Sequence, residues 1–231
     1  MIERFFIKGL RVIWPGGALD AQPGTDGAII LNPTQAPQPM TSDGMDGELY
    51  DLGLPNITDL GLRKGQTIPF SWLCYAPGRT TKRMLSAGDV LTGYMSGCPI
   101  ALWTENGMRF VGHVGTIDSN PPVNQLVRQT FANAMPHDVT GFNPAAAWQP
   151  NEIAGMMGKL KTVFADPKVM ALVTTNGDFY SIVMFRLTTR APNPPVPAST
   201  FVVGGAKRVP PLNYQGMRQY LLPNAPVIGR R

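Results

Sequence analysis

The chain has few of the residues that build metal sites. Its 231 residues include two cysteines, Cys74 and Cys98, and two histidines, His113 and His137. None of these residues has the paired spacing of a Cys/His zinc site. We therefore expect no bound zinc, and we expect no metal and no organic cofactor. A disulfide between the two cysteines stays open as an alternative to two free thiols.

Long apolar runs and concentrated charge are also missing. No window reaches the roughly 18 apolar residues that a membrane span needs, and residues 1–8 lack the apolar core and cleavage site of a signal peptide. The 20 basic and 15 acidic residues are scattered, without a nucleic-acid-reading motif. We expect a soluble protein that binds no nucleic acid and, if exported, leaves by a route independent of a signal peptide.

Glycine and proline are abundant instead. They number 25 and 23, whereas 15% of residues are charged and 43% are hydrophobic. This composition favours turns and short strands over long helices, yet it supplies enough apolar residues for a core. We predict one α+β domain over residues 1–231. Its expected architecture is a loop-rich, β-sandwich-like core of mixed or antiparallel strands, flanked by helices.

Residues 98–116 contain the clearest local pattern. Asn106-Gly107 separates two runs of strand-forming residues, which is a strong signal for a two-residue β-hairpin turn. With those two residues as the loop, Ile100 faces His113 and Cys98 faces Gly115. Cys98 and His113 are then diagonal neighbours on one face, and their backbones lie about 7 Å apart across the hairpin. Apolar residues on both faces predict that both are covered: Ile100, Leu102 and Val111 on one, and Trp103, Met108 and Phe110 on the other.

Helices and a second hairpin are expected after residue 116. Asn120 can cap a helix that starts at Pro121-Pro122 and continues with apolar residues at helical spacing. That helix should pack on the first hairpin. Another helix is expected over Glu152–Phe164, and Asn176-Gly177 predicts a hairpin between Val169–Thr175 and Phe179–Leu187.

The pairing of Cys98 with His113 suggests nucleophilic chemistry. A thiol attacks as the thiolate, which a neighbouring imidazole can generate, and the same imidazole can later protonate a departing amine. Cys74 lies in the apolar run Phe70–Tyr75, which is typical of a core residue. His137 follows the first predicted helix, where an imidazole can satisfy free carbonyl groups. Cys98 and His113 are therefore the candidate dyad.

The residues around Cys98 resemble a toxin family. The segment Thr92-Gly-Tyr-Met-Ser-Gly-Cys98 resembles the Thr-x-Tyr-Leu-Ser-Gly-Cys stretch of Burkholderia lethal factor. Ser96-Gly97-Cys98, followed fifteen residues later by His113-Val-Gly-Thr116, is similar to the catalytic pattern of cytotoxic necrotizing factor. Both are Cys-His glutamine deamidases. The resemblance covers about residues 88–130, and Met95 stands where the lethal factor has leucine.

The resemblance implies a function and further site residues. It implies a cysteine-dependent hydrolase that deamidates a glutamine of a folded host protein, in the class of Rho-family GTPases or translation helicases. Such an enzyme would act as a virulence effector in the host cytosol. By resemblance Thr92 would orient His113 through its hydroxyl or its carbonyl group. Gly97 and Ser96 would leave room for the substrate, and backbone N–H groups near Cys98 would stabilise an oxyanion.

Other functions stay open on the sequence. A cysteine protease or amidase could use the same dyad, and so could a chemotaxis-type receptor deamidase. A Ser96-His113-Asp118 hydrolase can be written, but it lacks the G-x-S-x-G nucleophile elbow. A non-enzymatic β-rich interaction or assembly protein would also account for the glycine, proline and asparagine content, with Thr92 serving as an ordinary strand residue.

Overall fold

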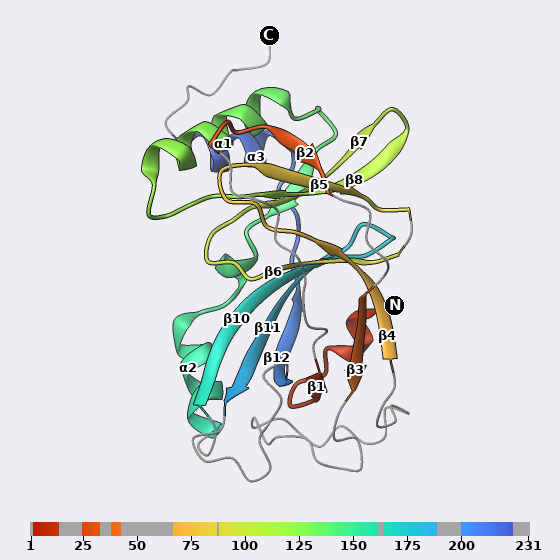
Figure 1. Cartoon of the computed structure of the whole chain (residues 1–231), viewed down its shortest axis with the longest axis vertical. Helices are drawn as coiled ribbons and strands as arrows, with labels where there is room; N and C mark the ends of the chain where they lie inside the picture. The colour runs from red at the N-terminus through yellow and green to blue at the C-terminus, as the bar shows by residue number, and fades with distance from the viewer. Residues whose placement is uncertain are drawn as a thin grey trace.

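Two sheets and three α-helices make up the described part of the chain. The computed structural model describes residues 2–13, 25–32, 38–42, 67–86, 88–160, 164–188 and 200–223. Figure 1 shows a curled sheet in its lower half and a second sheet with two helices above it. Each strand of the curled sheet pairs with the next, and the last pairs with the first, so the sheet closes. Its order is β1 (Arg11–Ile13), β12 (Thr200–Arg208), β11 (Phe179–Thr188), β10 (Phe164–Val173), β6 (Val90–Gly93), β4 (Thr67–Leu73) and β3 (Gln38–Ser42).

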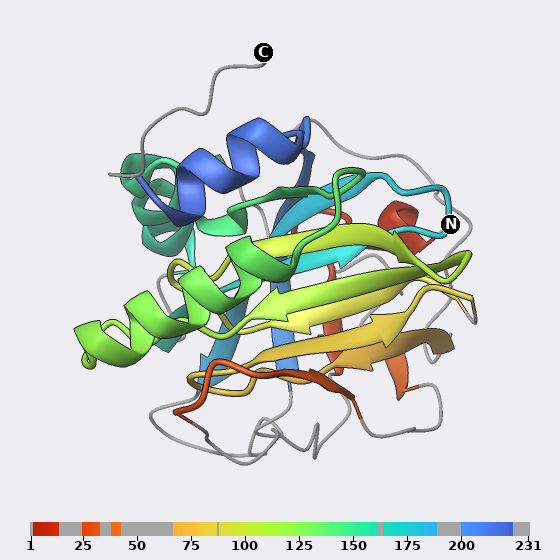
Figure 2. The same ribbon diagram turned by 90° about the horizontal axis from the view of Figure 1, so that it is seen from above.

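The second sheet has five strands and carries the predicted hairpin. Figure 2 shows helices lying across its outer face. These helices are α1 (Pro121–Ala134) and α3 (Tyr214–Leu221), while α2 (Pro150–Lys159) packs beside the curled sheet. The two 3-10 helices are η1 (Ile2–Phe5) and η2 (Pro144–Ala147). The strand order is β2 (Ile29–Leu31), β5 (Thr80–Met84), β8 (Met108–Val114), β7 (Ile100–Glu105) and β9 (Thr140–Phe142).

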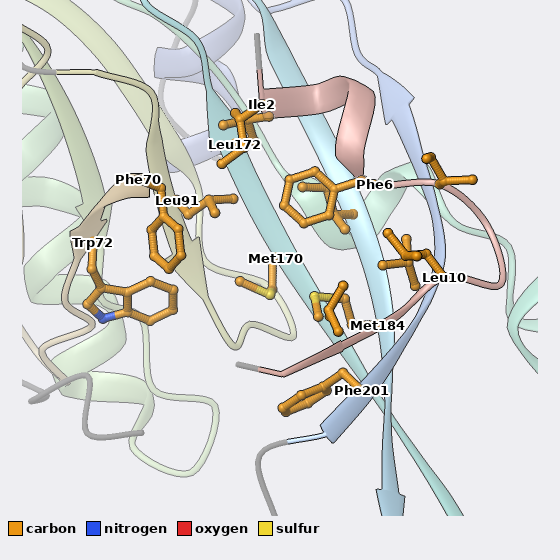
Figure 3. Close-up of a cluster of buried hydrophobic side chains, with 14 of the residues drawn as sticks. Ile2, Phe6, Leu10, Phe70, Trp72, Leu91, Met170, Leu172, Met184 and Phe201 are labelled. Carbon is orange, nitrogen blue, oxygen red and sulfur yellow. The ribbon is translucent and has the colours of Figure 1, made fainter. Parts of the chain in front are cut away.

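Strand alternation divides the buried side chains into separate layers. In β10, Met170 and Leu172 point into the curled sheet, whereas Ala171 and Val173 point outward to the five-stranded sheet. Figure 3 shows the cluster inside the curled sheet, where Met170 lies among apolar side chains from η1, β4 and β12. A separate cluster fills the space between the two sheets. The predicted α+β class with a strand-rich core is therefore confirmed.

The first hairpin has the predicted register. Ile100 pairs with His113 and Glu105 with Met108, around the turn at Asn106-Gly107, where both residues have positive φ. Ile100, Leu102 and Val111 face the curled sheet, while Trp103 and Phe110 pack under the helices. The prediction for Met108 is wrong. It lies beside the Asn106-Gly107 turn at the hairpin tip and is 41% exposed.

Local signals also located the later elements. The Asn120 side chain accepts a hydrogen bond from the N–H of Val123 at the start of α1, and Val127 and Phe131 bury the predicted face against the hairpin. Asn176-Gly177 lies between β10 and β11, as expected. The second helix is shorter than predicted, because it ends at Lys159 and Phe164 already begins β10. Within the described residues, no helix is long and apolar enough to cross a membrane.

Gly115 provides a test of the packing where the hairpin leaves the five-stranded sheet. A Cβ atom at this position would lie 2.0 Å from the Ala76 carbonyl oxygen and 2.6 Å from that of Arg79. Gly115→Ala should therefore lower the free energy of unfolding by at least about 2 kcal/mol, measured by urea denaturation. Gly97→Ala is the matched control, because a Cβ there meets nothing within 4 Å, and it should change stability by less than about 0.5 kcal/mol. Equal effects of the two changes would contradict the described packing.

Candidate active site

The predicted site residues gather between the two sheets. Cys98 lies two residues before β7, His113 is in β8, and Thr92 is in β6 of the curled sheet. Val90 points out of the curled sheet toward the hairpin, and Thr92, two residues later, points the same way. His113 and Thr92 are fully buried, and Cys98 is 5% exposed. The space between the sheets therefore contains all three residues of the predicted catalytic set.

A hydrogen bond joins Thr92 to His113. Thr92 Oγ1 lies 2.7 Å from His113 Nδ1, so the hydroxyl group, and not the backbone carbonyl, contacts the ring. Two proton arrangements fit this distance: the hydroxyl donates to Nδ1, or the Nδ1–H donates to the hydroxyl. In the second arrangement Nε2 carries the lone pair. Nε2 is buried and has no hydrogen-bond partner among the described residues.

The Cys98 thiol is held by Thr116. Its sulfur lies 3.2 Å from Thr116 Oγ1 and 3.8 Å from the Thr116 carbonyl oxygen. Cys98 shares its buried cluster with Ile100, which faces His113 across the hairpin. The predicted placement of Cys98 and His113 on one face is therefore present, but among the described residues no hydrogen bond connects the thiol to the imidazole. Cys74 is also a free thiol and lies inside the curled sheet, so the alternative of a disulfide is wrong.

Tyr75 links the two halves of the site. Its hydroxyl donates a 2.9 Å hydrogen bond to the Thr116 carbonyl oxygen, which also accepts from Cys98. Its ring packs against the His113 ring with centroids 5.3 Å apart. Sequence reasoning assigned no role to Tyr75 or Thr116. Thr116 stands inside the His113-Val-Gly-Thr116 motif, whereas Tyr75 lies two residues after β4 and no local signal marks it.

Burial keeps both candidate residues, Cys98 and His113, uncharged. Desolvation lowers the pKa of His113 from 6.5 to about 3, so the ring is neutral at pH 7. Burial also raises the pKa of the Cys98 thiol, although its hydrogen bonding with Thr116 opposes this effect. The resting state is therefore thiol and imidazole, rather than a thiolate and imidazolium pair.

Ser96 and Gly97 form the outer rim beside Cys98. Ser96 is exposed, and its hydroxyl donates to Asp118 Oδ2 at 3.2 Å. This bond joins two members of the alternative Ser96-His113-Asp118 triad, but His113 is buried and bonded to Thr92 instead. A Cβ atom built at Gly97 would meet nothing within 4 Å. The described residues contain no cluster of three or more His, Cys, Asp or Glu side chains that could hold a metal ion.

Comparison of the chain with protein-family models, curated proteins and solved structures found no match.

The buried imidazole predicts a loss of stability in acid. Unfolded chains protonate His113 below about pH 6.5, whereas the folded protein binds this proton only near pH 3. The neutral ring therefore contributes fully to the free energy of unfolding above pH 6.5, and this contribution is lost as the pH falls toward 3. Between pH 7 and pH 5 this residue alone should cost about 2 kcal/mol of unfolding free energy. His113→Gln should remove that loss in urea titrations, while His137→Gln, at an exposed position, should retain it. An unchanged slope in His113→Gln would contradict the described burial.

The Thr116 hydrogen bonds predict a change in thiol ionisation. Thr116→Val removes the hydroxyl group that stabilises the Cys98 thiolate, so the Cys98 pKa should rise further above its ordinary value. Iodoacetamide labelling across a pH series, with site-resolved mass spectrometry, measures the midpoint. Labelling of buried Cys74 in the same samples reports unfolding. A midpoint that stays unchanged or falls would show that Thr116 does not hold the thiol.

Proposed function

We propose that the chain is a glutamine deamidase in which Cys98 is the nucleophile and His113 is the base. The observation that supports this most strongly is the 2.7 Å contact between Thr92 Oγ1 and His113 Nδ1, on the face of the hairpin that also carries Cys98. A hydroxyl group bonded to Nδ1 can select the ring tautomer that leaves Nε2 as a proton acceptor. The resemblance of residues 88–130 to Cys-His deamidase toxins suggests the same roles.

The first step forms a thioester. The Cys98 thiol turns away from Thr116, transfers its proton to His113 Nε2, and attacks the side-chain amide carbon of the substrate glutamine. The carbonyl oxygen becomes the oxyanion of a tetrahedral intermediate, which backbone N–H groups near Cys98 stabilise. The carbon–nitrogen bond then breaks as His113 returns the proton to the nitrogen. Ammonia leaves, and the acyl group stays on sulfur.

The second step releases glutamate. His113 Nε2 takes a proton from water, and the resulting hydroxide attacks the thioester carbon. The carbon–sulfur bond breaks, the proton returns to Cys98, and the substrate carries a carboxyl group in place of the amide. The neutral pair suits this cycle, because both proton transfers begin and end with an uncharged imidazole. The new negative charge on the target is a physical reason for its altered function.

Burial limits which substrates can react. Cys98 is 5% exposed and directly follows the rim formed by exposed Ser96 and half-buried Gly97, where we place the substrate entrance. A glutamine side chain must enter past this rim, and its binding also desolvates the reacting groups. These features suit a folded protein that presents a protruding glutamine. We propose a host regulatory protein of the Rho-family GTPase or translation-helicase class, as the resemblance implies, with action in the host cytosol after export.

The deamidase proposal is tested by incubating a host-cell lysate with purified protein and analysing the proteins by mass spectrometry. A Gln-to-Glu change adds roughly one dalton to a peptide, and the wild type should produce it in at least one lysate protein. Cys98→Ser should abolish the change, because a hydroxyl group is a poor nucleophile without a thiol's acidity. Cys74→Ala is the matched control, since it removes the other thiol from a different core, and it should retain activity.

Two results would reject the deamidase assignment. A lysate without any Cys98-dependent mass shift would contradict it outright. Cleaved peptides in place of intact deamidated chains would assign the same pair to a cysteine protease.

A further inference from the structure

The C-terminal helix contacts the residue that precedes the proposed nucleophile. The hydroxyl of Tyr220, in α3, donates a 3.1 Å hydrogen bond to the carbonyl oxygen of Gly97. The two residues are 123 positions apart in the chain. Burial raises the pKa of Tyr220, so the hydroxyl remains protonated and acts as a donor at neutral pH. The Gly97 carbonyl group is therefore held from outside its own loop.

Contacts with α1 hold Tyr220 in position. Arg128 Nη1 donates to the Tyr220 carbonyl oxygen at 3.4 Å, and the guanidinium lies 5.5 Å from the centre of the Tyr220 ring. Arg128 is fixed in turn by a 3.0 Å bond from Nε to the Asn124 side chain. Met217 and Leu221, on the buried side of α3, pack into the cluster beneath α1. These contacts make the Tyr220 hydroxyl a rigid support.

The Gly97 carbonyl and the Cys98 N–H belong to the same peptide group. Because a trans peptide is planar, its carbonyl and N–H bonds point in opposite directions, and fixing one fixes the other. The Gly97–Cys98 bond is trans. In the part of the chain that the structure describes, no acceptor takes the Cys98 N–H. A donor without a partner beside a nucleophilic sulfur suits the binding of an oxyanion.

We infer that Tyr220 is a positioning residue of the Cys98 site: by holding the Gly97 carbonyl it aims the Cys98 N–H at the oxyanion of the acyl-transfer intermediate. This inference rests on the proposed function, because it needs a tetrahedral intermediate at Cys98. It assigns the C-terminal helix a role in the reaction, although Tyr220 contacts neither the substrate nor the sulfur in the proposed mechanism.

The test compares two reactions of the same thiol. Acylation of Cys98 by p-nitrophenyl acetate passes through an oxyanion, whereas alkylation by iodoacetamide displaces iodide from a saturated carbon and forms none. Tyr220→Phe keeps the ring and removes the hydroxyl. It should slow Cys98 acylation about tenfold while changing Cys98 alkylation by less than about twofold. Site-resolved mass spectrometry measures both labels, and their ratio is independent of the folded fraction.

Tyr214→Phe is the matched control. Tyr214 lies on the same helix but packs against His137 with ring centroids 4.6 Å apart, so it should leave the ratio unchanged. Labelling of buried Cys74 reports any unfolding. Equal acylation by wild type and Tyr220→Phe would overturn the positioning role alone, as would a parallel fall in both reactions. A wild-type Cys98 that is alkylated but never acylated would remove the proposed function as well.

Discussion

The hydrogen bond between Thr92 and His113 is the interaction on which the site depends, because it crosses from the curled sheet to the five-stranded sheet. Thr92 belongs to β6, between β4 and β10, and His113 belongs to β8, between β5 and β7. Both are fully buried, and His113 Nε2 has no partner among the described residues, so without this bond both ring nitrogens would be buried and unsatisfied. Such a group costs about 1 to 3 kcal/mol. The contact therefore fixes the imidazole relative to both sheets.

Local patterns were enough to predict the part of the site that one hairpin carries. Asn106-Gly107 fixes the register that places Ile100 opposite His113, and Asn120 with Pro121 marks the start of α1. The rest depends on contacts between distant segments. Neither turn chemistry nor periodicity could place Tyr75 beside His113, because that contact follows from how the two sheets pack.

Cys98 also shows what local sequence patterns cannot predict, here within a single segment. The hairpin register predicted its face correctly, but the strand pairing ends at Ile100 and His113, and the thiol turns to Thr116. Side-chain direction beyond the end of a ladder depends on nearby hydrogen-bond partners, which strand alternation does not describe. The Thr92 hydroxyl contacts His113 Nδ1, the ring that the toxin resemblance pairs it with.

Burial sets the charge state from which the proposed mechanism starts. In the proposed mechanism, the uncharged thiol and imidazole between the two sheets are unreactive at rest. They react when a substrate carbonyl group accepts the developing negative charge. This requires His113 to be neutral, with its proton on Nδ1. Nitrogen-15 NMR of histidine-labelled protein at pH 7, with His137→Gln simplifying the spectrum, measures this directly. We expect a protonated Nδ1 and an unprotonated Nε2 for His113; an imidazolium ring, or a proton on Nε2, would contradict the proposed mechanism.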